Sequence, residues 1–87
     1  MGNSTKILNR LRTMHSHGID VNNIGEFIDL QRRASVKIDT LDKGEYISIL
    51  YGRYVLFETW EVIANNLGIT LSYAHRLHKK ALEQFIK

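Results

Sequence analysis

Hydrogen-bonding and cationic side chains gather on one side of the segment 71–87. At about 100° per residue, as in a helix, that side holds Ser72, Tyr73, His75, Arg76, Lys79 and Lys80. Four Lys or Arg residues stand in the segment against a single acid, Glu83. Hydroxyl, imidazole and guanidinium groups bond to the edges of base pairs, and Lys and Arg pair with phosphates. The residue types therefore indicate binding to a nucleic acid duplex.

The residues before this segment can position it. Thr59 is suited to cap the start of a helix, and Gly68, which adopts a left-handed backbone at little cost, is suited to end it. Thr70 then starts a second helix whose apolar side is formed by Ala74, Leu77, Ala81 and Phe85. A connection this short makes the two helices cross steeply. The spacing predicts a helix-turn-helix, with the second helix as the recognition helix in the major groove.

We divide the polar residues between two roles, because early side chains of a recognition helix meet base edges and later ones meet phosphates. The predicted base-reading residues are Ser72, Tyr73, His75, Arg76 and Lys79. The predicted phosphate-binding residues are Thr59, Lys80 and Arg53. A basic face late in a helix also has a plainer explanation, since the helix dipole favours cations there and water solvates them.

The segment from Leu50 to Leu82 resembles region 4 of the sigma-70 family. The pattern of that region is matched in register by Thr59, Trp60, Ile63, Ala64, Leu67, Gly68, Ile69, Thr70, Ala81 and Leu82. The segment is more similar still to short sigma-like regulators of phages and prophages, the RinA and ArpU kind. That likeness rests on Arg53, Tyr54, Thr59, Trp60, Arg76, Leu77 and His78. The resemblance implies a helix-turn-helix domain that binds duplex DNA and regulates phage or prophage genes.

The segment departs from sigma region 4 at the start of the expected recognition helix. Charged residues are usual there in the family, whereas this chain has Leu71, Ser72 and Tyr73. Recognition of an ordinary promoter element is therefore not implied. A chain of 87 residues also has no room for the other regions of a sigma factor. We expect an activator or a repressor, not a complete sigma factor.

The whole chain reads as one small all-α domain, residues 1–87. It contains no proline, and apolar residues recur at helical spacing along it. We divide it into leading helices within residues 1–41 and a central helix plus helix-turn-helix within residues 42–87. A chain of this length buries one modest core, which a dimer interface or a partner would reinforce.

The first helix is predicted from Ser4 to His17, with Ser4 or Thr5 as its cap and Gly18 at its end. It has three bases and no acid: Lys6, Arg10 and Arg12. If it lies on the same face as the recognition helix, it extends the phosphate-binding surface; otherwise it forms a separate patch for another partner. The sequence does not place it, and we favour the first arrangement.

The second helix is predicted to begin at Asn22 or Asn23 and to end near Leu41. One face of it carries Ile24, Phe27, Ile28, Gln31, Ser35 and Ile38. This apolar stripe is long for so short a chain. The helix from Asn23 to Leu41 is therefore the candidate seam of a homodimer.

The third helix is predicted to start with a capping box formed by Asp42 and Glu45. Apolar and aromatic residues surround it almost completely: Ile47, Ile49, Leu50, Tyr51, Tyr54, Val55, Leu56 and Phe57. A helix of this kind belongs at the centre of a fold, between the leading helices and the helix-turn-helix. Core packing also explains its aromatic residues better than stacking on unpaired bases does.

Composition and hydropathy indicate where in the cell the protein is located. The chain contains no cysteine. Its net charge of +3 is unevenly distributed, because both ends of the chain are basic and the middle is acidic. No apolar run reaches the length of a membrane span, and the N-terminus lacks the hydrophobic stretch of a signal peptide. We expect a cytoplasmic protein.

Neither metal binding nor catalysis is indicated. His15 and His17 form one pair and His75 and His78 another, but no cysteine or paired carboxylate completes a zinc set beside them. A partly buried His78 and a groove-facing His75 explain the second pair without a metal. Phosphate-binding glycine loops and catalytic triads are also missing, so we expect no cofactor and no enzymatic activity.

Three hypotheses remain open. The first is a sequence-specific regulator of transcription that binds duplex DNA. The second is a protein-binding module that docks on RNA polymerase or another nucleic-acid enzyme, in which case Arg10 and Arg12 of the leading helices would be the first residues to test. The third is a DNA-packaging recognition subunit, which would share the fold and differ in oligomeric state.

Overall fold

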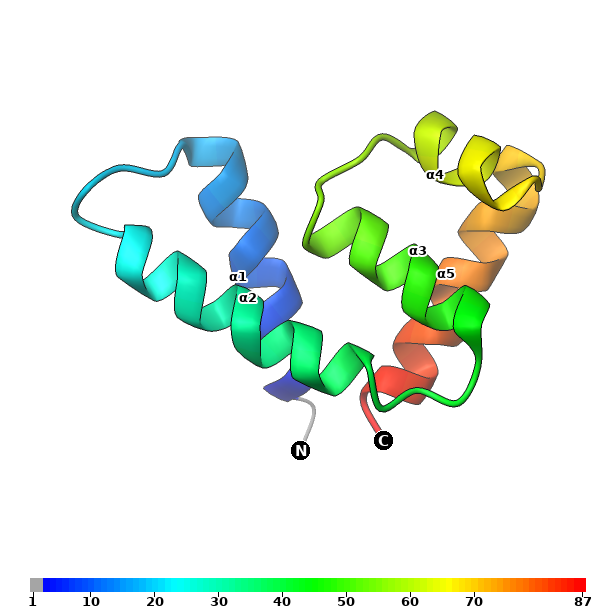
Figure 1. The fold of residues 1–87 in the computed structure, drawn as a ribbon, viewed down its shortest axis with the longest axis horizontal. Coiled ribbons are helices and arrows are strands. Elements are labelled where there is room, and N and C mark those ends of the chain that lie inside the picture. The colour runs from blue at the N-terminus through cyan, green and yellow to red at the C-terminus, as the bar shows by residue number, and fades with distance from the viewer. Residues whose placement is uncertain (1–2) are drawn as a thin grey trace.

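The computed structural model describes residues 3–87 and consists of five α-helices with short connections (Figure 1). They are α1 (Asn3–His17), α2 (Ile24–Ile38), α3 (Gly44–Tyr54), α4 (Trp60–Leu67) and α5 (Leu71–Phe85). No strand occurs within residues 3–87. The predicted all-α fold is confirmed.

Side-chain caps fix the starts of α4 and α5. Thr59 Oγ1 accepts a hydrogen bond from the backbone N–H of Val62 at 3.2 Å, and Thr70 Oγ1 accepts one from Tyr73 at 3.1 Å. Between the two helices, Gly68 has a left-handed backbone with φ of 68°. These groups satisfy helix-end N–H donors and turn the chain within three residues, Gly68 to Thr70. The predicted ends at Thr59, Gly68 and Thr70 are confirmed.

The predicted boundaries of the leading helices are partly wrong. α1 begins at Asn3, one residue before the predicted start at Ser4. α2 starts after Asn23 as predicted, but it ends at Ile38, before Leu41. The hydroxyl of Thr40 donates a hydrogen bond to the carbonyl of Lys37 at 2.6 Å, which satisfies a last-turn acceptor and ends the helix early.

The predicted capping box of α3 is also wrong. Lys43, not Asp42, is the N-cap residue, and no side chain caps this end. Tyr46, Ile49 and Leu50 are buried, so packing sets the register of the helix instead of a local cap.

The other end of α3 comes earlier than predicted, at Tyr54. The side-chain amide of Gln31 on α2 donates to the carbonyl of Val55 at 3.1 Å and so bonds the chain just after the helix. Phe57 then has φ of 54°, a left-handed value that is unusual for a large side chain. Its ring stacks on His15, with centroids 4.0 Å apart, and on Phe27, at 5.8 Å. These contacts hold the strained residue out of the helix.

The apolar face of α2 is rotated from the predicted one. Its buried residues are Phe27, Leu30, Ala34 and Ile38. Leu30 and Ala34 thus take the inward places expected for Gln31 and Ser35, whereas Ile24 and Ile28 are 43% and 48% exposed. The rotation arises because α1 and α3 both pack on α2, and two neighbours together decide which side is covered.

The core is centred on α3, which packs against each of the other four helices. Figure 1 shows α3 between the pair α1 and α2 and the pair α4 and α5. The largest fully buried side chains come from four helices: Leu8, Leu11, Ile38, Ile49, Leu50 and Phe85. The predicted central position of this helix is confirmed. A single core therefore supports α5 from behind.

Candidate nucleic-acid interface

The two sides of α5 differ sharply in burial and chemistry. Ala74, Leu77, Ala81 and Phe85 are buried against the rest of the protein. All six polar and cationic residues that the sequence predicts to contact DNA from this helix are exposed: Ser72, Tyr73, His75, Arg76, Lys79 and Lys80. Because α5 runs from the short turn towards the C-terminus as one helix (Figure 1), these side chains share one continuous surface.

The cations on this surface have no anionic partner among the described residues. No carboxylate within residues 3–87 forms an ion pair with Arg76, Lys79 or Lys80. The guanidinium of Arg76 lies over the ring of Tyr73, 5.6 Å from its centroid, near the start of the helix. The charge of the surface is therefore available to an external anion.

Thr59 lies at the exposed start of α4. Its oxygen already accepts the capping bond from Val62, so its hydroxyl hydrogen is the group left to donate. The residue can thus cap a helix and donate to a phosphate at the same time.

Arg53 belongs to the last turn of α3 and not to α5. Its guanidinium stacks over the Trp60 ring, 4.6 Å from the centroid, and one terminal nitrogen donates to the carbonyl of Glu58 at 3.4 Å. The Trp60 ring also lies 4.5 Å from the ring of His75. Through this contact the structure brings Arg53 beside α5. Burial, and then the charge of Arg12, lowers the pKa of Arg53.

His78 is partly buried behind the exposed surface. Its Nε2 lies 2.8 Å from the hydroxyl of Tyr54, and its ring packs edge-on against Trp60 at 4.9 Å. Burial, followed by the charges of Arg53, His75 and Arg12, lowers the pKa of His78 to about 4. The ring is therefore neutral near pH 7 and joins α5 to α3.

The sequence predicts Arg12 only as one of three bases on a first helix that would extend the phosphate-binding surface. α1 packs against α3 and α5, and Arg12 lines a notch together with Arg53 of α3. The charge of Arg12 contributes to lowering the pKa values of Arg53 and His78. Arg10, two residues earlier, instead forms a two-bond ion pair with Glu26 of α2, at 3.0 and 3.1 Å. Residues two apart lie on opposite sides of a helix, so this spacing was the signal that the two arginines differ.

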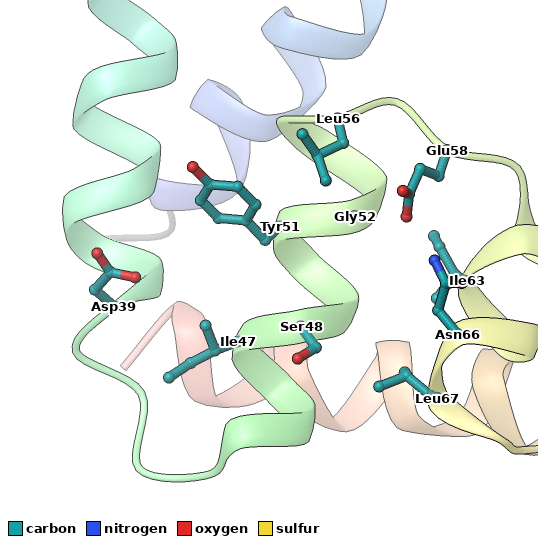
Figure 2. Close-up of a pocket in the computed structure, with 10 residues that line it drawn as sticks. All are labelled: Asp39, Ile47, Ser48, Tyr51, Gly52, Leu56, Glu58, Ile63, Asn66 and Leu67. Atoms are coloured by element: carbon teal, nitrogen blue, oxygen red, sulfur yellow. The ribbon is translucent and has the colours of Figure 1, made fainter.

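A groove with an apolar and acidic lining, unlike the basic side of α5, lies between α3 and α4, with the end of α2 at its edge (Figure 2). Its volume is about 570 Å³. Ile47, Leu56, Ile63 and Leu67 form its apolar lining, and two carboxylates, Asp39 and Glu58, line it without any base. At Gly52 the helices nearly touch, since a Cβ there would lie 3.2 Å from Cγ1 of Ile63. No residue of this groove was predicted as a functional one.

Within residues 3–87, no three His, Asp or Glu side chains gather as ligands for a metal ion. In the same part of the chain, no helix combines the length and the apolar character that crossing a membrane requires.

The chain was compared with protein-family models, curated proteins and solved structures, and it has no significant match among any of the three.

Proposed function

We propose that the protein binds duplex DNA through α5 and regulates transcription, as a phage or prophage regulator acting in the cytoplasm. One observation carries this proposal: the exposed side of α5 presents Arg76, Lys79 and Lys80 without a carboxylate partner within residues 3–87. Ser72, Tyr73 and His75 precede these cations in the chain and are exposed on the same side of α5. In a helix laid into the major groove, such groups meet bases first and phosphates next.

The two helices joined by Gly68 and Thr70 support the proposal geometrically. The caps at Thr59 and Thr70 fix both helix starts, and the core behind α5 holds its apolar side. A helix that is already rigid loses little conformational entropy when it enters a groove.

Binding to labelled duplex DNA across a salt series tests this function. Arg76→Ala combined with Lys79→Ala should weaken binding roughly thirtyfold at about 0.15 M salt, because two phosphate or base contacts are lost. Arg32→Ala combined with Arg33→Ala is the matched control, since it removes the same charge from the exposed side of α2. Equal weakening in both double variants would mean that only net charge matters and would refute a role for α5.

The second candidate function is docking on RNA polymerase or another nucleic-acid enzyme. The groove between α3 and α4 favours it, because an apolar lining with Asp39 and Glu58 suits a partner segment of basic and apolar residues. Leu56→Asp should abolish capture of RNA polymerase in that case. Under the DNA-binding proposal the same variant keeps its affinity for duplex DNA.

A homodimer remains part of the proposal, on a smaller surface than the sequence predicts. The inward residues of α2 are used by the core of one chain. Ile24 and Ile28 stay nearly half exposed, and Val21 beside them is 89% exposed. We propose that two copies pair through this patch.

A further inference from the structure

A polar notch of about 220 Å³ lies where α1 meets the connection that follows α3. It is lined by Arg12, His15, Ser16, Arg53 and Phe57. Two guanidinium groups, an imidazole and a hydroxyl therefore face a space whose lining contains no carboxylate. Each of these polar groups can donate a hydrogen bond, so the lining is suited to an anion.

The guanidinium of Arg53 is incompletely satisfied in the protein alone. Its Nε is buried and has no hydrogen-bond partner among the described residues. Arg12, which also lines the notch, carries the same charge. Burial, and then repulsion from Arg12, lowers the pKa of Arg53. A buried donor without a partner and two adjacent cations both raise the free energy of the folded state. An anion bound in the notch offsets the repulsion between the two guanidinium groups.

The walls of the notch are held in place before any ligand arrives. Arg53 is fixed by the Trp60 ring and by the carbonyl of Glu58. The His15 ring lies flat on the Phe57 ring, with the two planes only 4° apart. Side chains that are already ordered lose little entropy on binding, which favours a defined site.

The polar surface continues along α1 beyond the notch. A second hollow of about 370 Å³ shares Arg12 and Ser16 with it. Its other lining residues are Asn9, Thr13 and His17, none of which is a carboxylate. A line of donors of this kind can follow a chain of phosphates and not only a single one.

We propose that the notch between Arg12 and Arg53 binds a phosphate group, and that in a complex with DNA it holds a backbone phosphate next to the segment contacted by α5. Its identity as a DNA phosphate rests on the proposed function. The link to α5 is short, because Arg53 stacks on Trp60 and Trp60 contacts His75. Guanidinium groups bind phosphate with two parallel bonds, which suits the pair.

The test compares Arg12→Gln with Arg10→Gln in the duplex-binding salt series. Both variants remove one positive charge from α1, but Arg10 is engaged by Glu26, whereas Arg12 forms no ion pair with any residue that the structure describes. Arg12→Gln should weaken binding roughly fivefold at about 0.15 M salt on every sequence, and should reduce the slope of log affinity against log salt by about 0.9. Arg10→Gln should leave the slope unchanged. Circular dichroism checks that both variants keep their helices.

Equal slopes for Arg12→Gln and the wild type would overturn the phosphate site while leaving DNA binding by α5 intact. If the wild type does not bind duplex DNA at all, the proposed function fails, and inorganic phosphate becomes the probe. Titration with it, followed by the NMR signals of the arginine Nε–H groups, should then shift Arg12 and Arg53 but not Arg10. Absence of those shifts would overturn the site in that setting too.

Discussion

The hydroxyl of Tyr54 and Nε2 of His78 lie 2.8 Å apart and join the central helix α3 to α5. The bond lies behind the exposed basic surface, where Tyr54 is buried and His78 is partly buried. Burial raises the pKa of Tyr54, against the charges of Arg12 and Arg53, and it lowers the pKa of His78. Each group is thereby kept neutral around pH 7, which is the state in which they can share a hydrogen.

Stability should fall on acidification because of His78. Its pKa is lowered from 6.5 to about 4 in the folded protein, so between these values the unfolded chain binds a proton that the folded one does not. The contribution of the neutral ring is complete above pH 6.5 and is lost as the pH falls toward 4. The full shift corresponds to about 3 kcal/mol, and screening of the partly exposed ring reduces this to about 1.5 kcal/mol.

Urea unfolding at several pH values measures this loss. His78→Gln has no proton to gain, so the difference in unfolding free energy between it and the wild type should shrink as the pH falls from 7 to about 4. A difference that stays constant over this range would show that His78 does not titrate with folding.

Removing the hydroxyl of Tyr54 should be costly. Tyr54→Phe deletes one partner of a part-buried bond and leaves the His78 ring nitrogen unpaired, which destabilises the fold by about 1–2 kcal/mol. Tyr51→Phe, on the same helix but at the wall of the α3–α4 groove, is the matched control and should have little effect. Similar losses in both variants, measured by urea unfolding, would contradict a special role for the Tyr54 hydroxyl.

The cap of α5 offers another test. Thr70→Ala removes the oxygen that accepts the bond from Tyr73 and should destabilise the protein by about 1 kcal/mol. Thr70→Ser keeps that oxygen and should restore most of the loss in thermal unfolding. Failure of serine to do better than alanine would mean that the cap is not what stabilises this end.

Self-association should depend on the exposed patch of α2. Ile28→Lys introduces a charge into the patch that contains Ile24 and Val21. In sedimentation equilibrium, this variant should form less dimer than the wild type at the same concentration. Val36→Lys, at a residue 64% exposed about two turns further along α2, is the control and should leave the dimer unchanged. A wild type that sediments as a monomer at every concentration would rule out the proposed homodimer.

Features decided by local chemistry could be predicted from the sequence. The ends of α4 and the start of α5 depend on Thr59, Gly68 and Thr70, whose side chains or backbone act within three residues of their own positions. The apolar side of α5 follows from helical spacing alone. For the same reason, the exposed candidates on α5 lie where the sequence predicts.

Features decided by distant contacts could not be predicted. α3 ends at Tyr54 because Gln31 bonds to Val55 and the Phe57 ring is held by α1 and α2. The place of Arg12 depends on how α1 packs beside α3 and α5. Periodicity gives the side of a helix on which a residue lies, but not which neighbour that side meets.

The position of Phe57 bears on whether the protein can be divided. Its ring belongs to the connection between α3 and α4, yet it contacts His15 of α1 and Phe27 of α2. Detaching the leading helices would strip both contacts and open the core around α3. The five helices should therefore melt as one cooperative unit, with amides of α2 and α5 exchanging with solvent at the same free energy of opening. A peptide cut down to α4 and α5 would not hold the exposed basic side of α5 in place on its own.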